Sequence, residues 1–188
     1  GALAEGSVQE SPEIAVTAGG GGPLVAVVAE PDRGALTREL CGAAAKLASE
    51  IGGSTVLLSP YRLDPKEAGG WGADHLVLVE EAGTEEDIAG ALADWARVEA
   101  PWAILAGSTA YGREIASRVA VAVEAGLTGD VVDLEVVDER LVAWKPAFGG
   151  LLVAAITATS PIQMATVRAG VLPRPKPRTS EAKLSTVV

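Results

Sequence analysis

The sequence has very little of the chemistry that most active sites use. It contains one cysteine, Cys41, and one histidine, His75, so neither a disulfide framework nor a His/Cys metal cluster can be assembled. A catalytic set of a nucleophile, a histidine and an acid cannot be assembled either. Cys41 lies in a helical pattern of Ala and Leu, and His75 begins an apolar strand pattern. Both are therefore interpreted as structural residues, and no metal site is predicted.

Long apolar runs and basic charge are also scarce. No apolar run reaches the ~18 residues that would span a bilayer. The net charge is −10 and the pI is about 4.6, which argues against nucleic acid as the main partner. Aromatic residues make up only 4% of the 188 residues, yet 48% are hydrophobic. That composition excludes overall disorder and predicts one domain with a core of small aliphatic side chains.

The pattern of apolar runs predicts an α/β fold. Four runs are apolar on both faces, as buried parallel strands are: residues 24–29, 55–58, 75–79 and 102–106. Helical patterns cover about 35–51, 84–100 and 110–125, and Thr84–Asp87 resembles a capping box at one helix start. This alternation predicts a three-layer αβα, Rossmann-like domain with a mostly parallel sheet.

The last third of the sequence has a different texture. After Gly129 no helical period appears, and strand-like runs follow one another: residues 131–137, 141–145, 151–157 and 164–171. They are predicted to form a β meander that extends or flanks the parallel sheet.

The two ends of the chain differ in composition from the middle. Residues 1–22 end in four glycines and lack a signal-peptide pattern, so they are expected to be a flexible N-terminal tail. Residues 23–172 are predicted to form the domain. Residues 173–188 begin with alternating proline and basic residues and are predicted to be an extended, poorly packed linker tail. Deleting residues 174–188 is then expected to change the melting temperature by no more than about 2 °C.

The best candidate binding site is the junction after the strand at 102–106. Ligands of α/β sheets bind at the carboxyl ends of strands, and a helix N-terminus offers free N–H groups to an anion. The candidate anion or nucleotide edge consists of Gly107, Ser108, Thr109 and Arg113.

Two other interpretations of this junction follow from its spacing. Gly107 and Gly112 are spaced as in a phosphate loop, but Arg113 and Glu114 stand where such a loop needs Lys and Ser or Thr. A P-loop NTPase is therefore rejected. A capped helix, with Ser108 or Thr109 as N-cap, remains an alternative to a ligand site.

Two later segments supply candidate interface residues. Phe148, Gly149 and Gly150 lie between two strands, where a glycine pair marks a bulge or a close backbone approach. Gln163 and Arg168 flank an otherwise apolar strand. Apolar strands with no helix left to cover them usually mark an interface, so these residues are predicted to lie near a partner subunit.

Taken together and in this order, the motifs resemble the electron transfer flavoprotein alpha subunit family. The segments that carry the resemblance are Trp71–Asp74, Ala106–Glu114, Leu127–Val131, Lys145–Gly150 and Gln163–Arg168. The resemblance covers roughly residues 24–172. Leu151 replaces a residue that is often polar in the family, and Ala169 replaces one that is usually proline. These two departures put local contacts in doubt without changing the fold.

The resemblance implies an electron-carrier domain without a catalytic site of its own. In that family a second, C-terminal domain holds most FAD contacts, and its motifs are absent here, so this chain is not expected to retain FAD. The chain would be a platform that pairs with the beta subunit, in which AMP can be bound. The complete FAD-containing heterodimer would take electrons from dehydrogenases such as the acyl-CoA dehydrogenases of fatty acid beta-oxidation. A cytoplasmic location and no membrane insertion are expected.

Two hypotheses from other classes remain at this stage. A stand-alone adenine-nucleotide-binding domain, universal-stress-like or nucleotide-hydrolase-like, has the same alternation of strands and helices. It needs a phosphate cradle at Gly107–Arg113, and stabilisation by AMP or ATP would favour it. The other hypothesis is an interaction domain that binds no ligand.

Overall fold

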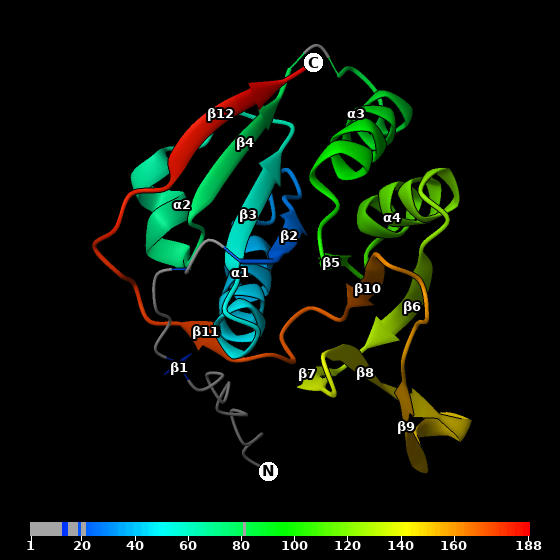
Figure 1. Ribbon diagram of the computed structural model, residues 1–188. Coiled ribbons are helices and arrows are strands. Elements are labelled where there is room, and N and C mark those ends of the chain that lie inside the picture. Colours follow the sequence, from blue (N-terminus) through cyan, green and yellow to red (C-terminus); the bar gives the residue numbers. More distant parts are fainter. Residues whose placement is uncertain (1–12, 15–18, 20–21, 81) are drawn as a thin grey trace, which may run out of the picture.

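A wholly parallel, seven-stranded sheet forms the centre of the molecule (Figure 1). The computed structural model describes residues 13–14, 19, 22–80 and 82–188. The strand order is β12-β4-β3-β2-β5-β10-β6. The bounds are β2 (Leu24–Val28), β3 (Ser54–Ser59), β4 (His75–Val79), β5 (Ala103–Gly107), β6 (Gly126–Val131), β10 (Gln163–Val167) and β12 (Lys183–Val187).

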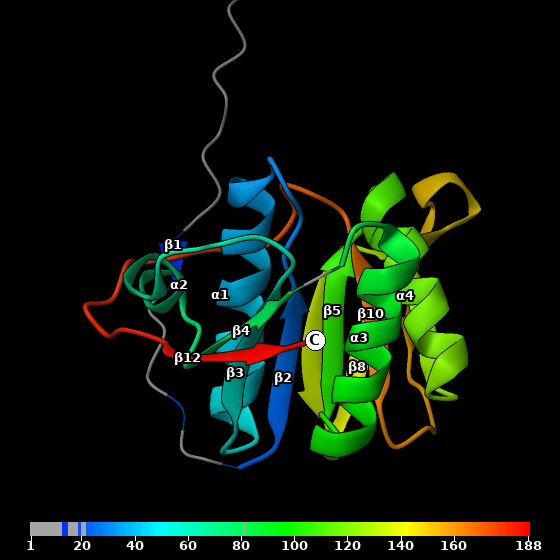
Figure 2. The ribbon, with the colours of Figure 1, turned by 90° about the horizontal axis from the view of Figure 1, so that it is seen from above.

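Helices cover both faces of this sheet (Figure 2). One layer contains α1 (Gly34–Glu50) and α2 (Pro65–Trp71), and the other contains α3 (Glu85–Glu99) and α4 (Ala110–Ala122). The predicted α/β, three-layer fold is thereby confirmed. The described helices include none that is both long and apolar enough to cross a membrane.

Local sequence explains where two of these helices begin. The capping box predicted before α3 is present, because Thr84 accepts a hydrogen bond from the Asp87 N–H and Asp87 accepts one from the Thr84 N–H. Helix α2 was not among the helices predicted from the sequence. It begins where Asp64 accepts from the Lys66 N–H and Pro65 takes the first helical position, which is where proline is favoured.

The core lies on both sides of the sheet, as expected for buried parallel strands. Leu40 and Leu47 of α1 pack on one face, and Leu92 of α3 and Ile115 of α4 pack on the other. Cys41 is fully buried, and burial raises the pKa of its thiol to about 12. It stays protonated at neutral pH and is a core residue, as predicted.

A separate antiparallel sheet follows β6. It contains β7 (Asp133–Val137), β8 (Arg140–Ala147) and β9 (Leu152–Ile156), with a short turn at Phe148–Gly150 between the last two. The predicted meander is confirmed for these three strands. The prediction is wrong for β10, which lies in the parallel sheet between β5 and β6. Strand β6 itself was missed because Gly126 and Gly129 weaken its strand pattern.

The C-terminal segment packs against the domain, so the prediction of a poorly packed tail is wrong. Strand β12 pairs in register with β4 along its whole length, and Ala182 is 4% exposed. The Pro175 ring fills the space over Gly42, where a Cβ atom would lie 2.6 Å from Pro175 Cδ. Here β11 (Arg174–Pro175) pairs with β1 (Glu13–Ile14). Most of the tail predicted over residues 1–22 lies outside the described residues.

A buried ion pair holds the C-terminal segment against the rest of the domain. The Arg178 guanidinium donates to Asp74 Oδ1 at 2.8 Å and to the Gly69 carbonyl at 2.8 Å. The two charged side chains are only 11% and 15% exposed. Asp74 also accepts from the Thr55 N–H at 2.9 Å, so one carboxylate joins the C-terminal segment to β3 and β4.

Arg178→Met should therefore destabilise the domain clearly. The substitution leaves the Asp74 carboxylate partly buried without its guanidinium, which costs about 2–3 kcal/mol of unfolding free energy. Urea unfolding measures the loss. Arg118→Met, which removes an exposed guanidinium from α4, is the matched control and should change stability little. Equal stability of Arg178→Met and the wild-type chain would contradict the docked position of the segment.

Candidate functional site

The carboxyl ends of β2 and β5 form the crevice where open α/β sheets usually bind ligands. From β2 the chain first builds the sheet outward through β3 and β4, and it then returns to place β5 on the other side of β2. Such a reversal of strand order leaves a crevice at the carboxyl edge. Glu30, just after β2, and Thr109, just after β5, lie at this edge.

An internal carboxylate occupies this crevice. Thr109 is the N-cap of α4, where its hydroxyl oxygen accepts from the Gly112 N–H at 2.9 Å and its O–H donates to Glu30 Oε2 at 2.7 Å. Glu30 Oε1 pairs with Arg33 Nε at 2.9 Å. Glu30 is only 7% exposed. The capped-helix interpretation is confirmed for Thr109, and a negative charge already lies near the positive end of α4.

A phosphate group does not fit beside this loop. A Cβ atom at Gly107 would lie 2.6 Å from Leu36 Cδ2 and 3.2 Å from Glu30 Oε2, so side chains of the chain itself fill the space. The Glu30 carboxylate would also repel an anion, since like charges in a buried site are costly. The space over Gly107 therefore does not fit a phosphate of FAD or of an adenine nucleotide.

Three of the predicted residues meet around an acid that was not singled out, Asp130. Arg168 binds the Asp130 carboxylate in two places, with Nε 2.9 Å from Oδ1 and Nη2 2.6 Å from Oδ2. The Ser108 hydroxyl donates to Asp130 Oδ1 at 3.0 Å. Arg113 donates to the Ser108 oxygen, and its Nη2 lies 3.6 Å from Asp130 Oδ1. We call Ser108, Arg113, Asp130 and Arg168 the Asp130 cluster.

The backbone places the Asp130 carboxylate in this cluster. Asp130 has φ of 65°, in the left-handed region, and its N–H donates to Thr166 Oγ1 at 3.0 Å. The register between β6 and β10 shifts at the same point, as bulges do when they redirect a side chain. The Arg168 hydrogen bonds are the main cause that lowers the pKa of Asp130 to about 2, and Ser108 lowers it further.

Neither of the two carboxylates at this edge, Glu30 and Asp130, was predicted from the sequence to be a site residue. Glu30 directly follows an apolar run that was correctly predicted as a strand, so its position at the carboxyl edge was available from the sequence. Asp130 is the second-to-last residue of β6, a strand that was not predicted. Asp130 lies in the segment Leu127–Val131, which is one of the segments that carry the family resemblance. That membership was the available signal for this residue.

The predicted interface residues lie in two different environments. Phe148, at the turn between β8 and β9, is 78% exposed, and Gly149 and Gly150 are exposed beside it. Gln163 is 2% exposed, and its side chain accepts from the Leu141 N–H at 2.9 Å and donates to the Trp102 carbonyl at 3.4 Å. Gln163 was predicted to lie near a partner subunit; within this chain its side chain is buried, and its amide joins the meander to the parallel sheet.

The turn around Phe148 is strained as well as exposed. Phe148 has φ of 50°, and Gly149 and Gly150 have φ of 68° and 90°. A bulky residue in the left-handed region is rare and carries a cost of order 1 kcal/mol or more. The strained turn exposes an aromatic ring to solvent. Backbone strain together with an exposed aromatic side chain points to a contact with another molecule.

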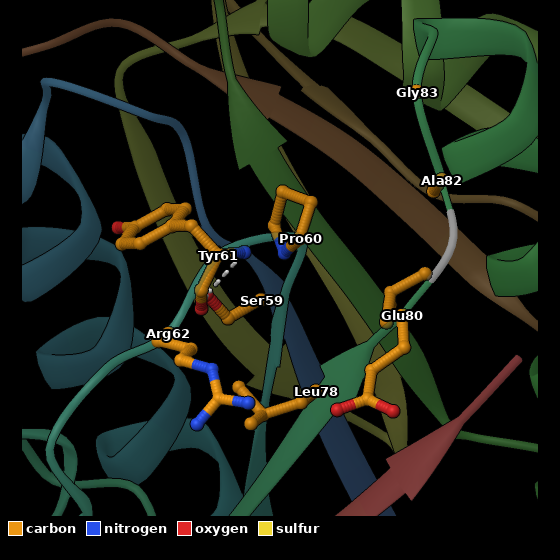
Figure 3. Close-up of a pocket in the computed structure, with 9 residues that line it drawn as sticks. Ser59, Pro60, Tyr61, Arg62, Leu78, Glu80, Ala82 and Gly83 are labelled. Atoms are coloured by element: carbon orange, nitrogen blue, oxygen red, sulfur yellow. Dashed lines mark hydrogen bonds between the residues drawn. The ribbon is translucent and has the colours of Figure 1, made fainter.

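A shallow pocket of about 480 Å³ opens at the carboxyl ends of β3 and β4 (Figure 3). Arg62 and Glu80 reach it from opposite walls, and Pro60 and Leu78 supply apolar surface. The Ser59 hydroxyl near its base donates to the Tyr61 carbonyl at 2.7 Å. The lining contains no histidine or cysteine. Across the part of the chain that the structure describes, no group of three or more potential metal ligands occurs.

Comparisons with known proteins agree on one family. The family profile described as "Electron transfer flavoprotein domain" matches residues 25–188. Protein FixB of Azorhizobium caulinodans is 36% identical over 73% of this chain and 41% of its own length. Electron transfer flavoprotein subunit alpha of Thermoanaerobacterium thermosaccharolyticum is 36% identical over 72% of this chain and 44% of its own length. Lactate dehydrogenase (NAD(+),ferredoxin) subunit LctC of Acetobacterium woodii is 35% identical over 75% and 36%. The chain thus spans less than half the length of these relatives.

The Asp130 cluster has a measurable consequence for titration. In Arg168→Gln the Asp130 pKa should rise from about 2 toward its ordinary value of 3.8, because the main cause of the depression is gone. NMR titration of the Asp130 carboxyl carbon measures this shift. Arg113→Gln, at 3.6 Å from the carboxylate, is the graded control and should raise the pKa less.

The effect of Arg168→Gln on the free energy of unfolding should depend on pH. A carboxyl with a depressed folded-state pKa contributes stability above its unfolded pKa and loses it as the pH falls through the folded value. The stability difference between wild type and Arg168→Gln should therefore be present above about pH 4 and shrink as the pH falls toward 2. A difference that does not depend on pH would contradict the ion-pair assignment.

Proposed function

The chain belongs to the electron transfer flavoprotein family, and on that premise we propose that it is the platform domain of an alpha-type subunit. It pairs with a beta subunit in a cytoplasmic, FAD-containing electron carrier that accepts electrons from dehydrogenases such as acyl-CoA dehydrogenases. Its own role is to bind the partner rather than to catalyse a reaction. Support comes from relatives whose names describe subunits, including an acryloyl-CoA reductase electron transfer subunit beta 31% identical over 71% of the chain.

The observation that carries the proposal is the uncharged tip and outer strand β9 of the β8–β9 hairpin. Phe148 and the next apolar residues Leu151, Leu152 and Val153 are 78%, 84%, 60% and 54% exposed. No charged residue lies between Lys145 and Arg168, although the whole chain has a net charge of −10. A contiguous apolar surface on an otherwise acidic protein is typical of a subunit interface.

We propose that the FAD of the complete carrier binds outside the residues that this structure describes. The carboxyl edge of this domain has Glu30 where a phosphate would bind, and Leu36 closes the space over Gly107. The same observation counts against a stand-alone adenine-nucleotide-binding domain. The platform interpretation needs no ligand at this edge.

The purified chain should therefore neither retain FAD nor respond to nucleotides. Gel filtration should give a colourless protein, and AMP, ATP or FAD should leave the melting temperature unchanged, because only a ligand of the folded state raises it. Flavin absorbance at one equivalent per chain after gel filtration would contradict the proposal. A concentration-dependent rise in melting temperature with AMP or ATP would favour the nucleotide-binding alternative.

Phe148 should act as the anchor of the partner interface. Exposed aromatic residues that become buried on binding dominate many interfaces. Phe148→Gly removes the ring and also relieves the left-handed strain, since glycine adopts φ of 50° freely. The domain should be at least as stable as wild type, while affinity for the beta subunit should fall about 10- to 100-fold.

Calorimetry with the beta subunit of the same organism measures the affinity, and thermal unfolding measures the stability. Val121→Ala is the matched control, because Val121 is an apolar residue of α4 that is 81% exposed and should not contribute to binding. Unchanged affinity of Phe148→Gly would exclude Phe148 as the anchor.

A further inference from the structure

Strand β9 is an open edge with two uncovered faces. Among the described residues it pairs with β8 alone, as the outer strand of the order β7-β8-β9. Leu152 and Val153 are consecutive, so their side chains point to opposite faces of the sheet, and both are more than half exposed. A partner that covered one flat face would leave the other bare. A partner aligned along the edge can cover both.

The register identifies which backbone groups of β9 face outward. Trp144 lies opposite Ala155 in the β8–β9 pair. The Trp144 carbonyl accepts from the Val132 N–H at 2.8 Å, so the backbone polar groups of Trp144 face the β7 side. In an antiparallel pair the bonded residues alternate. The N–H and C=O groups of Ala155, and of Val153 two residues before it, therefore face away from β8.

Proline placement agrees with this alternation. Pro146 lies opposite Val153 and has no N–H to donate. Its position is two residues from Trp144, so it belongs to the set that does not bond to β9. The β8–β9 ladder therefore loses no hydrogen bond because of the proline at position 146.

The edge has none of the usual protection against strand pairing. Natural edge strands carry charged residues, prolines or bulges that prevent another strand from joining. From Leu152 to Ile156 β9 has no charge and no proline, and its pairing with β8 is continuous over five residues. An unprotected, uncharged edge is suited to receive a strand by main-chain hydrogen bonding.

Charge favours a different chain over a second copy. Each copy has a net charge of −10, and the β7–β8 turn next to this sheet contains Asp138 and Glu139. Pairing two copies through β9 would bring two negatively charged domains close together. Their electrostatic repulsion opposes association. A neutral or basic partner meets no such repulsion.

We propose that the outer edge of β9 receives a β-strand from the beta subunit, so that the β7-β8-β9 sheet continues across the interface. The proposal rests on the proposed function and defines how the partner binds. The amides of Val153 and Ala155 donate to the added strand, Leu152 and Val153 are covered on the two faces, and Phe148 is the anchor at the end of the hairpin.

Amide hydrogen exchange on the wild-type chain, alone and with the beta subunit of the same organism, tests this directly. In the complex, exchange should slow at least about tenfold at Val153 and Ala155, because their N–H groups gain acceptors. Exchange at Leu152 and Ala154 should change less, because these residues already bond to β8. Ala155→Pro should weaken binding at least about tenfold, and Ala155→Val, which keeps the N–H, should bind within about twofold of wild type.

The outcomes separate the two proposals. A complex that forms without slower exchange at Val153 and Ala155 overturns strand addition and leaves the proposed function standing. Equal affinity of Ala155→Pro and Ala155→Val overturns it as well. Absence of any complex with the wild-type chain overturns both proposals. A dimer of the chain alone, with Ala155 protected, shows that the occupant is a second copy and overturns the assignment to a beta subunit.

Discussion

The need to cover β10 on both faces governs the C-terminal half of this molecule. All five residues of β10 are buried, yet the strand lies beside β6 near one end of the sheet (Figure 1). Helix α4 covers one of its faces. On the other face α1 is centred on β2, and Leu134 and Leu141 of the meander complete the same hydrophobic cluster. The meander is therefore a structural cover, and its outermost strand extends beyond what it covers.

That geometry explains why one strand is exposed on an otherwise well-packed protein. Strands β7 and β8 have an inner face on the core and are partly buried. In the part of the chain that the structure describes, strand β9 has only β8 beside it, so most of its side chains stay exposed. An outer strand that is uncharged, exposed on both faces and joined to β8 by a strained turn at Phe148 is costly to maintain alone. Its apolar surface is consistent with a subunit that functions in a complex.

At the carboxyl edge, two internal carboxylates take the positions where folds of this class receive anions. Glu30 accepts from the N-cap Thr109, and Asp130 is held by Arg168 and Ser108. Both satisfy donors that a ligand would otherwise satisfy. The hydrogen-bonding groups at this edge are thereby paired with one another within the chain.

The sequence by itself determined the local elements. Apolar runs at 24–29, 75–79 and 102–106 are readable as buried strands because both of their faces are hydrophobic, and Thr84 with Asp87 defines a helix start within four residues. The glycine pair at Gly149–Gly150 was correctly placed between two strands, although it forms a turn there and not the predicted bulge or close backbone approach. These features depend on contacts between near neighbours in the chain.

Only the tertiary structure decided the features that depend on distant contacts. Met164–Val167 is an apolar strand by sequence, but its place between β5 and β6 is set by a crossing of the chain that periodicity does not encode. Proline and basic residues made 173–188 look like a linker, yet Arg178 finds the Asp74 carboxylate a hundred residues away in sequence, at 2.8 Å. Asp130 becomes the centre of a cluster because three strands end together. Such partners are chosen by the packing of the whole domain, and their residue types alone do not reveal them.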